Sequence, residues 1–293
     1  MNRLLTYAQF VLNEGGKAID DAQPVSQSEV DGIVKLVKSE FEKAQSCKCG
    51  ITGEIFKIGS AGLKKDGEMS GDVDMCWIVE GDRKEKLLKL KGQMERLGHV
   101  TNYMPGLEIL SVAFAFGEKT VQVDFIASSD RTWAEFIYHS PDYRNDESKY
   151  KSAHRNWMFS AILSQLVEDV EKDAEGNMPA WTGYMLRLQD GLYRVRKSRV
   201  SLVQGCGLNQ HPRKESEEIV TNKPIEFVKF LFGDGHQPSD VATFEDVFSI
   251  ITKDGFKHAG LLSGIIKKYR EFLDRAKLPV PYEIKELDDD EDQ

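Results

Sequence analysis

The chain has 293 residues, which is enough for about two domains of roughly 150 residues each. Hydrophobic residues make up 40% of it and charged residues 30%, a composition typical of a globular protein that excludes disorder throughout. With 39 basic and 48 acidic side chains, the formal net charge is −9, which argues at first against a nucleic-acid-binding protein. Residues 286–293 contain six acids, however, so most of this excess negative charge belongs to the C-terminal end.

The sequence contains no signal for export or membrane insertion. No apolar run approaches the roughly 18 residues of a membrane span, and residues 1–13 lack the pattern of a secretory signal. The cysteines show neither the paired spacing of a zinc site nor the density of a secreted disulfide scaffold. They are Cys47, Cys49, Cys76 and Cys206. We therefore expect a cytoplasmic protein with free thiols and no membrane contact.

The first half of the chain alternates helices and strands. Ser26 and Glu29 form a capping-box pattern at the start of an amphipathic helix. Apolar alternation predicts strands at 54–58, 72–79, 107–116 and 121–126, and helical spacing predicts a helix at 83–97. Residues 117–119 suit a hairpin turn between the last two strands.

Beyond residue 130 the apolar spacing becomes helical. Helices are predicted at 148–170, 179–197, 224–232, 244–251 and 258–276, with a long loop at 200–221. The acidic residues 286–293 predict a disordered tail. We therefore predict an α+β fold, divided into a strand-rich domain (1–130), a helical domain (131–285) and the tail.

Three aspartates are candidates for a metal site. Alternate residues of a strand share a face, so Asp72 and Asp74 project together. The strand at 121–126 alternates in the same way and places Asp124 on its more polar face. If the two strands are adjacent, the three carboxylates meet, and such oxygen ligands suit a hard divalent cation.

A glycine–serine turn completes this pattern. Gly59 and Ser60 end the strand at 54–58, where a glycine permits close approach of a ligand and free N–H groups can hold phosphate oxygens. A phosphate-binding turn beside three carboxylates is what a two-metal phosphoryl transfer requires.

The arrangement Ile58-Gly59-Ser60, eleven residues, Asp72-Val73-Asp74-Met75 and a later Asp124 resembles the signature of the DNA polymerase β superfamily of nucleotidyltransferases. The resemblance covers about residues 50–130. It implies a polymerase-β-like catalytic domain with a mixed or antiparallel sheet, followed by a helical domain that binds the base or the acceptor.

The same resemblance implies roles for the motif residues. Gly59 and Ser60 would grip a nucleoside triphosphate such as ATP, and Asp72 and Asp74 would bind two Mg²⁺ ions, for which Mn²⁺ can substitute. Asp124 would bind one ion and help to deprotonate the acceptor hydroxyl. Residues 138–143 are also similar to phage-borne members of the superfamily, which would place the protein in a host cytoplasm.

Two groups of basic residues outside the motif are candidates for phosphate contacts. Lys151, His154 and Arg155 lie at helical spacings among aromatic residues and are candidate nucleotide-binding residues. The alternative is a helix whose apolar residues form the core while these basic residues face water, with His154 as a structural histidine. The second group is predicted to bind nucleic acid, or else to form a solvated helix face. It comprises Arg194, Arg196, Lys197 and Arg199.

The expected activity is metal-dependent transfer of a nucleoside monophosphate from a triphosphate to a hydroxyl acceptor, with release of pyrophosphate. We favour an RNA 3′ end as acceptor, as in the poly(A) polymerase and tRNA-tailing branches that the motif resembles, with DNA also open. The same chemistry on a small molecule, a second nucleotide or a protein side chain is an alternative. A nucleotide-binding or interaction protein without turnover is another.

Overall fold

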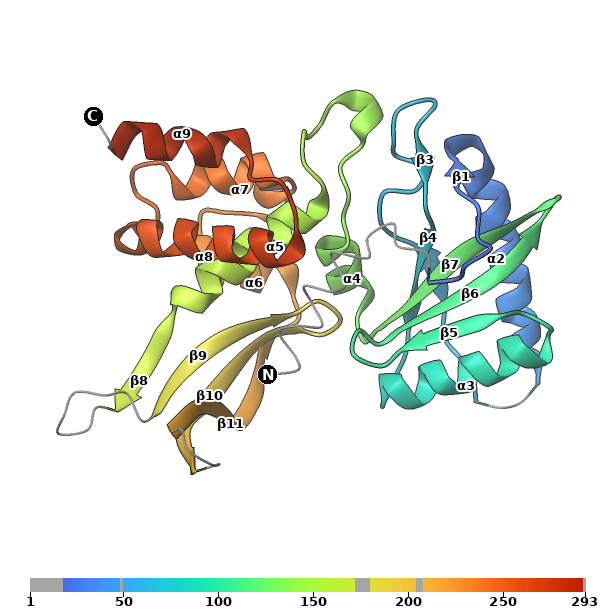
Figure 1. The fold of residues 1–293 in the computed structure, drawn as a ribbon, viewed down its shortest axis with the longest axis horizontal. Helices are drawn as coiled ribbons and strands as arrows, with labels where there is room; N and C mark the ends of the chain where they lie inside the picture. The colour runs from blue at the N-terminus through green and yellow to red at the C-terminus, as the bar shows by residue number, and fades with distance from the viewer. Residues whose placement is uncertain (1–17, 48–49, 172–179, 204–207, 292–293) are drawn as a thin grey trace. The chain divides into compact units, whose positions relative to one another are not determined.

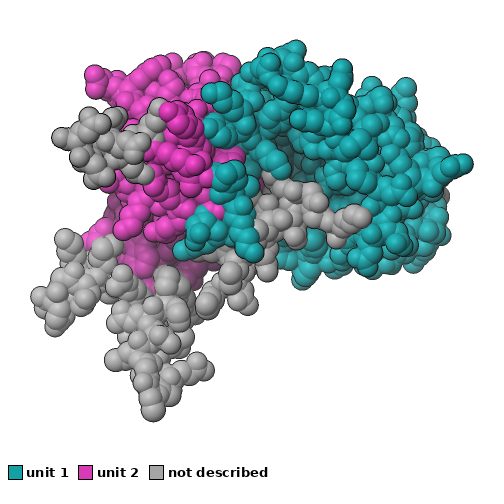
Figure 2. All heavy atoms as spheres, turned by 45° about the horizontal axis from the view of Figure 1, so that its top comes forward, with its two compact units in different colours: residues 1–153, 274–279 teal, residues 154–273, 280–293 magenta. Residues whose placement is uncertain are grey.

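A computed structural model describes residues 18–47, 50–171, 180–203 and 208–291 of the chain. The chain divides into two compact units, which Figure 2 colours separately. Unit 1 comprises residues 1–153 and 274–279, and unit 2 comprises residues 154–273 and 280–293. Both units combine helices and strands, so the predicted α+β class is confirmed.

Unit 1 is built on a five-stranded mixed sheet with the order β2-β4-β7-β6-β5 (Figure 1). The strands are β2 (Ile55–Lys57), β4 (Val73–Ile78), β5 (Thr101–Met104), β6 (Ile109–Phe116) and β7 (Lys119–Ser128). Only the central pair β4–β7 is parallel, while the other pairs are antiparallel. The strands predicted at 54–58, 72–79, 107–116 and 121–126 are thus confirmed, and β5 was not predicted.

One face of this sheet is covered by two helices, α2 (Val30–Ser46) and α3 (Arg83–Arg96) (Figure 1). The capping box before α2 forms as predicted, because the Ser26 N–H donates to Glu29 Oε2 at 2.9 Å. The helices bury their apolar stripes against every second residue of the strands, such as Met75 and Val123. The intervening residues of β4 and β7 therefore face the other side.

On that other face, two apolar clusters pack near opposite ends of the strands. Helix α4 (Arg131–Ile137) packs Ala134 into a cluster with Cys76 and Ile126. At the opposite end, Ile19 and Ala22 of the N-terminal segment pack with Ala113. A short pair, β1 (Val25–Ser26) with β3 (Met69–Ser70), forms a separate two-stranded sheet, and its Val25 packs into the core cluster of α2 and α3. The middle of the other face, between the two clusters, carries the polar residues of β4 and β7.

Unit 2 contains an antiparallel sheet where helices and a loop were predicted. Its order is β11-β10-β9-β8, with β8 (Val167–Glu171), β9 (Ala180–Arg187), β10 (Gly191–Val203) and β11 (Leu208–Thr221). The predictions of a helix at 179–197 and a loop at 200–221 are therefore wrong, and the predicted helix at 148–170 ends early, because α5 spans Ser152–Gln165. The domain is consequently not purely helical.

A tight hairpin explains this error. Residues 188–190 connect Arg187, the last residue of β9, to its register partner Gly191, the first residue of β10. A three-residue connection that is followed by a glycine is a hairpin signal, and here it outweighs helical spacing. Gly191 has φ +137°, and a Cβ there would lie 2.3 Å from the Thr221 carbonyl oxygen. Only glycine allows β10 to pair with β11 so closely at this point.

The remaining helices of unit 2 agree with the sequence except at the end. They are α6 (Pro224–Phe232), α7 (Phe244–Ile251), α8 (Leu262–Ala276) and α9 (Tyr282–Glu291), with short 3₁₀ turns at 238–241 and 259–261. Helix α9 contradicts the predicted disorder of 286–293: Ile284 is buried and anchors its first turn, and the helix continues into the acidic residues.

Two smaller findings concern the cysteines and the membrane. Cys76 is a buried free thiol as predicted, whereas Cys47 is disulfide-bonded, which corrects the expectation of free thiols throughout. Its partner lies outside the described residues. Within the described ranges, no helix combines the length and apolarity needed to cross a membrane.

Candidate active site

The central parallel pair places two of the predicted acids side by side. Asp74 of β4 and Asp124 of β7 are register partners, and adjacent strands lie about 4.8 Å apart. Both side chains project from the face that α2 and α3 do not cover. The adjacency of the two strands, on which the predicted carboxylate cluster depends, is thus confirmed.

The Gly59 turn lies directly against Asp74. The Ile58 N–H donates to the Asp74 carbonyl at 3.0 Å, which continues the β2–β4 pairing to the turn. Gly59 has φ +70°, and a Cβ on it would lie 2.4 Å from Asp74 Oδ2. Glycine is therefore required here both for the left-handed backbone and for the space that the carboxylate occupies.

A half-buried lysine braces the same turn. Lys57 Nζ donates to the Ala61 carbonyl at 2.6 Å, and the Leu63 N–H donates to the Ser60 carbonyl at 3.0 Å. Burial lowers the pKa of Lys57, while Asp31 and Asp74 oppose that effect. Ser60 is thus held in a tight turn next to a positive charge, as a phosphate-binding turn requires.

Two more lysines lie near the third acid, Asp72. Burial raises the pKa of Asp72, and the positive charges of Lys64 and Lys151 counteract that rise. Burial and the proximity of Lys151 lower the pKa of Lys64. Lys151, a predicted nucleotide-binding residue, is exposed beside this group. Lys57 and Lys64 were missed, although Lys64 follows the Gly-Ser turn by only four residues.

Asp124 is the most deeply buried of the three acids, at 8% exposure. Burial, together with repulsion from Asp72, raises the pKa of Asp124 to about 7. The Ser111 hydroxyl and the Gln122 amide oppose the rise, and Gln122 Nε2 donates to Asp124 Oδ1 at 3.0 Å. A carboxylate with this pKa exchanges a proton readily near neutral pH.

The donor chemistry suits Mg²⁺, but the carboxylates point to separate partners. Asp74 Oδ2 is directed toward Gly59, and Asp124 Oδ1 is bonded to Gln122. Within the described ranges, no three His, Cys, Asp or Glu side chains form a group that could hold a metal ion. The strand register thus fits a divalent-cation site, and rotation of the Asp74 side chain away from Gly59, with Asp124 Oδ1 kept on Gln122, would be needed to complete it.

Two of the predicted nucleotide-binding residues are buried within unit 2. His154 and Arg155 belong to unit 2 and are 3% and 0% exposed. His154 Nδ1 bonds to the Tyr269 hydroxyl at 2.8 Å, and Arg155 Nη1 donates to the Ala242 carbonyl at 3.0 Å. Both side chains are core residues of unit 2. A structural role is the alternative that the sequence left open for His154, whereas the alternative for Arg155 was a side chain that faces water.

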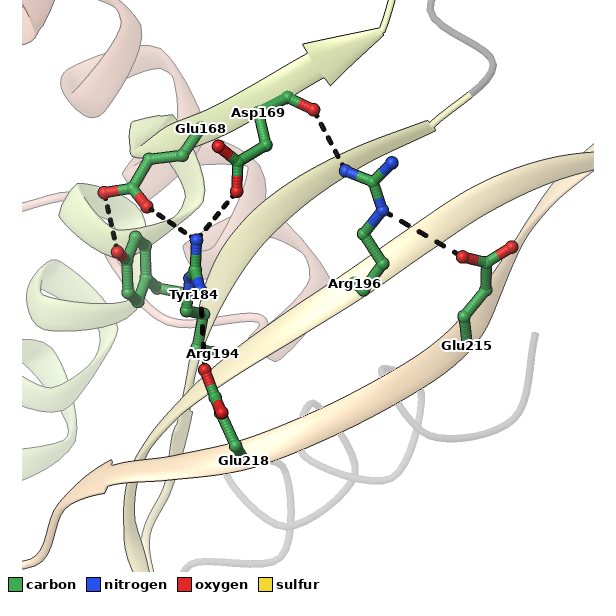
Figure 3. A network of polar contacts seen from close by, with 7 residues as sticks. All are labelled: Glu168, Asp169, Tyr184, Arg194, Arg196, Glu215 and Glu218. Carbon is green, nitrogen blue, oxygen red and sulfur yellow. Dashed lines mark hydrogen bonds and ion pairs between the residues drawn. The ribbon is translucent and has the colours of Figure 1, made fainter.

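The predicted nucleic-acid-binding arginines lie in an acidic network on the sheet of unit 2 (Figure 3). Arg194 Nη2 lies 2.7 Å from Asp169 Oδ2 and 3.4 Å from Glu168 Oε2, and its Nη1 lies 3.5 Å from Glu218 Oε1. Arg196 donates to the Asp169 carbonyl at 3.0 Å and faces Glu215 at 4.0 Å.

This network changes the interpretation of the basic group. Two guanidinium groups face four carboxylates, and the Tyr184 hydroxyl donates to one of them, Glu168, at 2.7 Å. The helix predicted from the sequence would have kept these acids apart from the arginines, whereas antiparallel pairing brings them together. Arg194 and Arg196 are therefore not a free basic surface.

The other two residues of that group give less information. Lys197 is half-buried in β10, and burial lowers its pKa. Arg199 also lies in β10, but its side chain is outside the described residues.

Comparison with known proteins assigns no family to the chain. No family model matches the chain, and no curated protein matches it. Among solved structures, polymerase beta of Leishmania infantum in a ternary P/T complex is similar, with 14% identity and a TM-score of 0.36. The match covers 64% of this chain and 68% of that one. The likeness is weak, and no functional inference rests on it.

Proposed function

We propose that the protein is a nucleotidyltransferase that moves a nucleoside monophosphate from a triphosphate to a hydroxyl acceptor. The observation that carries this proposal is the pairing of Asp74 with Asp124 across β4 and β7, with the Gly59 turn packed against Asp74. A tight turn with lysines nearby, together with one buried and two partly buried carboxylates, provides the elements that phosphoryl transfer needs.

In this proposal the turn and the lysines bind the triphosphate. Ser60 and the turn N–H groups contact phosphate oxygens, and Lys64 and Lys151 neutralise the charge of the leaving pyrophosphate. Mg²⁺ held by Asp72, Asp74 and Asp124 would supply the positive charge that stabilises the transition state.

Asp124 then accepts the proton of the acceptor hydroxyl. The hydroxyl oxygen forms a bond to the α-phosphorus, and the bond from that phosphorus to the oxygen bridging to the β-phosphate breaks, so pyrophosphate leaves with that oxygen. Oδ1 of Asp124 is bonded to Gln122, so the proton is held on Oδ2.

We leave the acceptor unassigned. The preference for an RNA 3′ end rested on a free basic surface, and Arg194 and Arg196 are instead paired with acids. The acceptor pools in the test therefore include RNA, DNA, small metabolites and the protein alone.

The test incubates the protein with α-labelled nucleoside triphosphates and Mg²⁺ in each pool and measures label transfer and pyrophosphate. We expect the wild type to transfer label in at least one pool. The transfer rate should fall at least 100-fold in Asp72→Ala and in Asp124→Asn. Asp66→Asn, which changes an exposed acid of the neighbouring loop, should keep the wild-type rate. Absence of transfer in every pool, or full activity of Asp72→Ala, would overturn the proposal. Triphosphate binding without pyrophosphate release would identify a binding protein instead.

A further inference from the structure

A buried amide connects Asp124 to the N-terminal segment of unit 1. Gln122 lies in β7 two residues before Asp124 on the same face, and it is 1% exposed. Its Nε2 donates to Asp124 Oδ1 at 3.0 Å. Its Oε1 accepts from the N–H groups of Ala18 at 2.9 Å and of Ile19 at 3.1 Å.

These contacts allow only one orientation of the amide. Backbone N–H groups are donors alone, so two of them in front of one amide atom require that atom to be the oxygen. The Gln122 nitrogen must then face Asp124. In a flipped amide, the NH₂ group of Gln122 would face the N–H groups of Ala18 and Ile19, so that donors would face donors. Buried polar groups would then lose their hydrogen bonds, which costs free energy.

The segment that holds the amide is itself anchored. Asn102 Nδ2 donates to the Ala18 carbonyl at 3.0 Å, and the Gln23 N–H donates to the Thr120 carbonyl at 2.8 Å. Ile19 is buried against Ala113, the register partner of Gln122 on β6. The position of the amide thus depends on a segment more than one hundred residues away in sequence.

We propose that Gln122 is a positioning residue, which fixes Oδ1 of Asp124 and thereby the orientation of the carboxylate that accepts the proton and would bind the cation, and that residues 18–19 maintain this orientation. The inference rests on the proposed function. It makes catalysis depend on docking of the N-terminal segment, because loss of the two N–H donors frees the amide to rotate and the carboxylate with it.

The test compares Gln122→Met, which keeps the size but removes both sets of hydrogen bonds, with Gln93→Met, which alters a buried glutamine in α3. In Gln122→Met we expect kcat to fall about 10- to 100-fold, as for other residues that orient a metal ligand. The triphosphate KM should change less than twofold, because the phosphate-binding turn is untouched. Gln93→Met should keep the wild-type kcat.

Two readouts do not depend on activity. Calorimetry with Mn²⁺ should give an affinity about 10-fold lower for Gln122→Met than for the wild type. Hydrogen exchange should show faster exchange of the Ala18 and Ile19 amides in that variant. Asn102→Ala removes a hydrogen bond that anchors the segment outside the site, and it should also lower kcat, but by a smaller factor. This variant provides the test if Gln122→Met does not fold.

The outcomes separate this inference from the proposed function. One outcome refutes the positioning role alone. In it the wild type transfers nucleotide, and both Gln122→Met and Asn102→Ala keep the wild-type kcat and Mn²⁺ affinity although the Ala18 and Ile19 amides exchange faster. The proposed function then stands. If the wild type neither transfers nucleotide nor binds Mn²⁺, both are refuted. A fall in kcat for Gln93→Met equal to that for Gln122→Met would also refute a specific role of Gln122.

Discussion

Replacement of Asp124 with asparagine tests the electrostatics of the site without any substrate. In the folded protein, burial and the charge of Asp72 raise the pKa of Asp124 to about 7, from an ordinary value of 3.8. Between these two pH values the folded state holds a proton that the unfolded state has released. The contribution of Asp124 to stability therefore falls as the pH rises from about 4 to about 7.

The size of this effect follows from the two pKa values. A pKa shift of about three units corresponds to about 4 kcal/mol over the whole titration, and about 3 kcal/mol of this develops between pH 5 and pH 8. Asparagine has no proton to lose in this range. The free energy of unfolding of Asp124→Asn, minus that of the wild type, should thus rise by about 3 kcal/mol from pH 5 to pH 8.

Urea unfolding at the two pH values, with EDTA present, measures this difference. Asp66→Asn removes one exposed negative charge and provides the control, with a difference that stays within about 0.5 kcal/mol. Addition of Mg²⁺ at pH 8 should stabilise the wild type more than Asp124→Asn, because a ligand that binds the folded state stabilises it. A flat difference between pH 5 and pH 8, or one of opposite slope, would refute the burial and repulsion assigned to Asp124.

Three further substitutions test individual contacts. Gly59→Ala should lower the free energy of unfolding by about 1–3 kcal/mol in urea titrations, because the new Cβ would lie 2.4 Å from Asp74 Oδ2. Gly67 also has a positive φ, but no atom lies near the position of a Cβ there, so Gly67→Ala should lower the free energy of unfolding by less. Arg194→Met should lower the free energy of unfolding only slightly by the same assay, since its ion pairs are partly exposed. It should also leave RNA affinity in filter binding unchanged, and a loss of affinity would restore the nucleic-acid role. Ser26→Ala should lower the free energy of unfolding by about 1 kcal/mol through loss of the capping box, and should therefore lower the midpoint temperature of thermal unfolding. An unchanged midpoint temperature would refute that contribution.

The core of the site could be predicted because its signals are local. Alternation within single strands placed Asp74 and Asp124 on the polar faces, and the Gly59–Ser60 turn follows directly from the glycine. The same alternation also placed Gln122 on the face of Asp124. Its contacts with residues 18–19 could not be foreseen, because they depend on how a distant segment docks.

Unit 2 could be predicted less well, because its sheet depends on pairing between strands. β11 is rich in charged and polar residues with no clear periodicity, and it becomes a strand by pairing along the length of β10. The side chains of Tyr184 and Arg194 face one another from β9 and β10 only in that sheet. The helical spacing of residues 179–197 therefore led to a wrong prediction, because pairing between strands determines the structure of this segment.

The parallel pairing of β4 and β7 makes the site insensitive to the length of the chain between its acids. Interstrand hydrogen bonds, rather than the forty residues from 79 to 118, set the distance between Asp74 and Asp124. Gly98 and Gly117 lie in turns of that connection with open space around them. A peptide or a small domain inserted at either turn would leave the carboxylates in register, so this connection is a natural place for engineered or evolved additions.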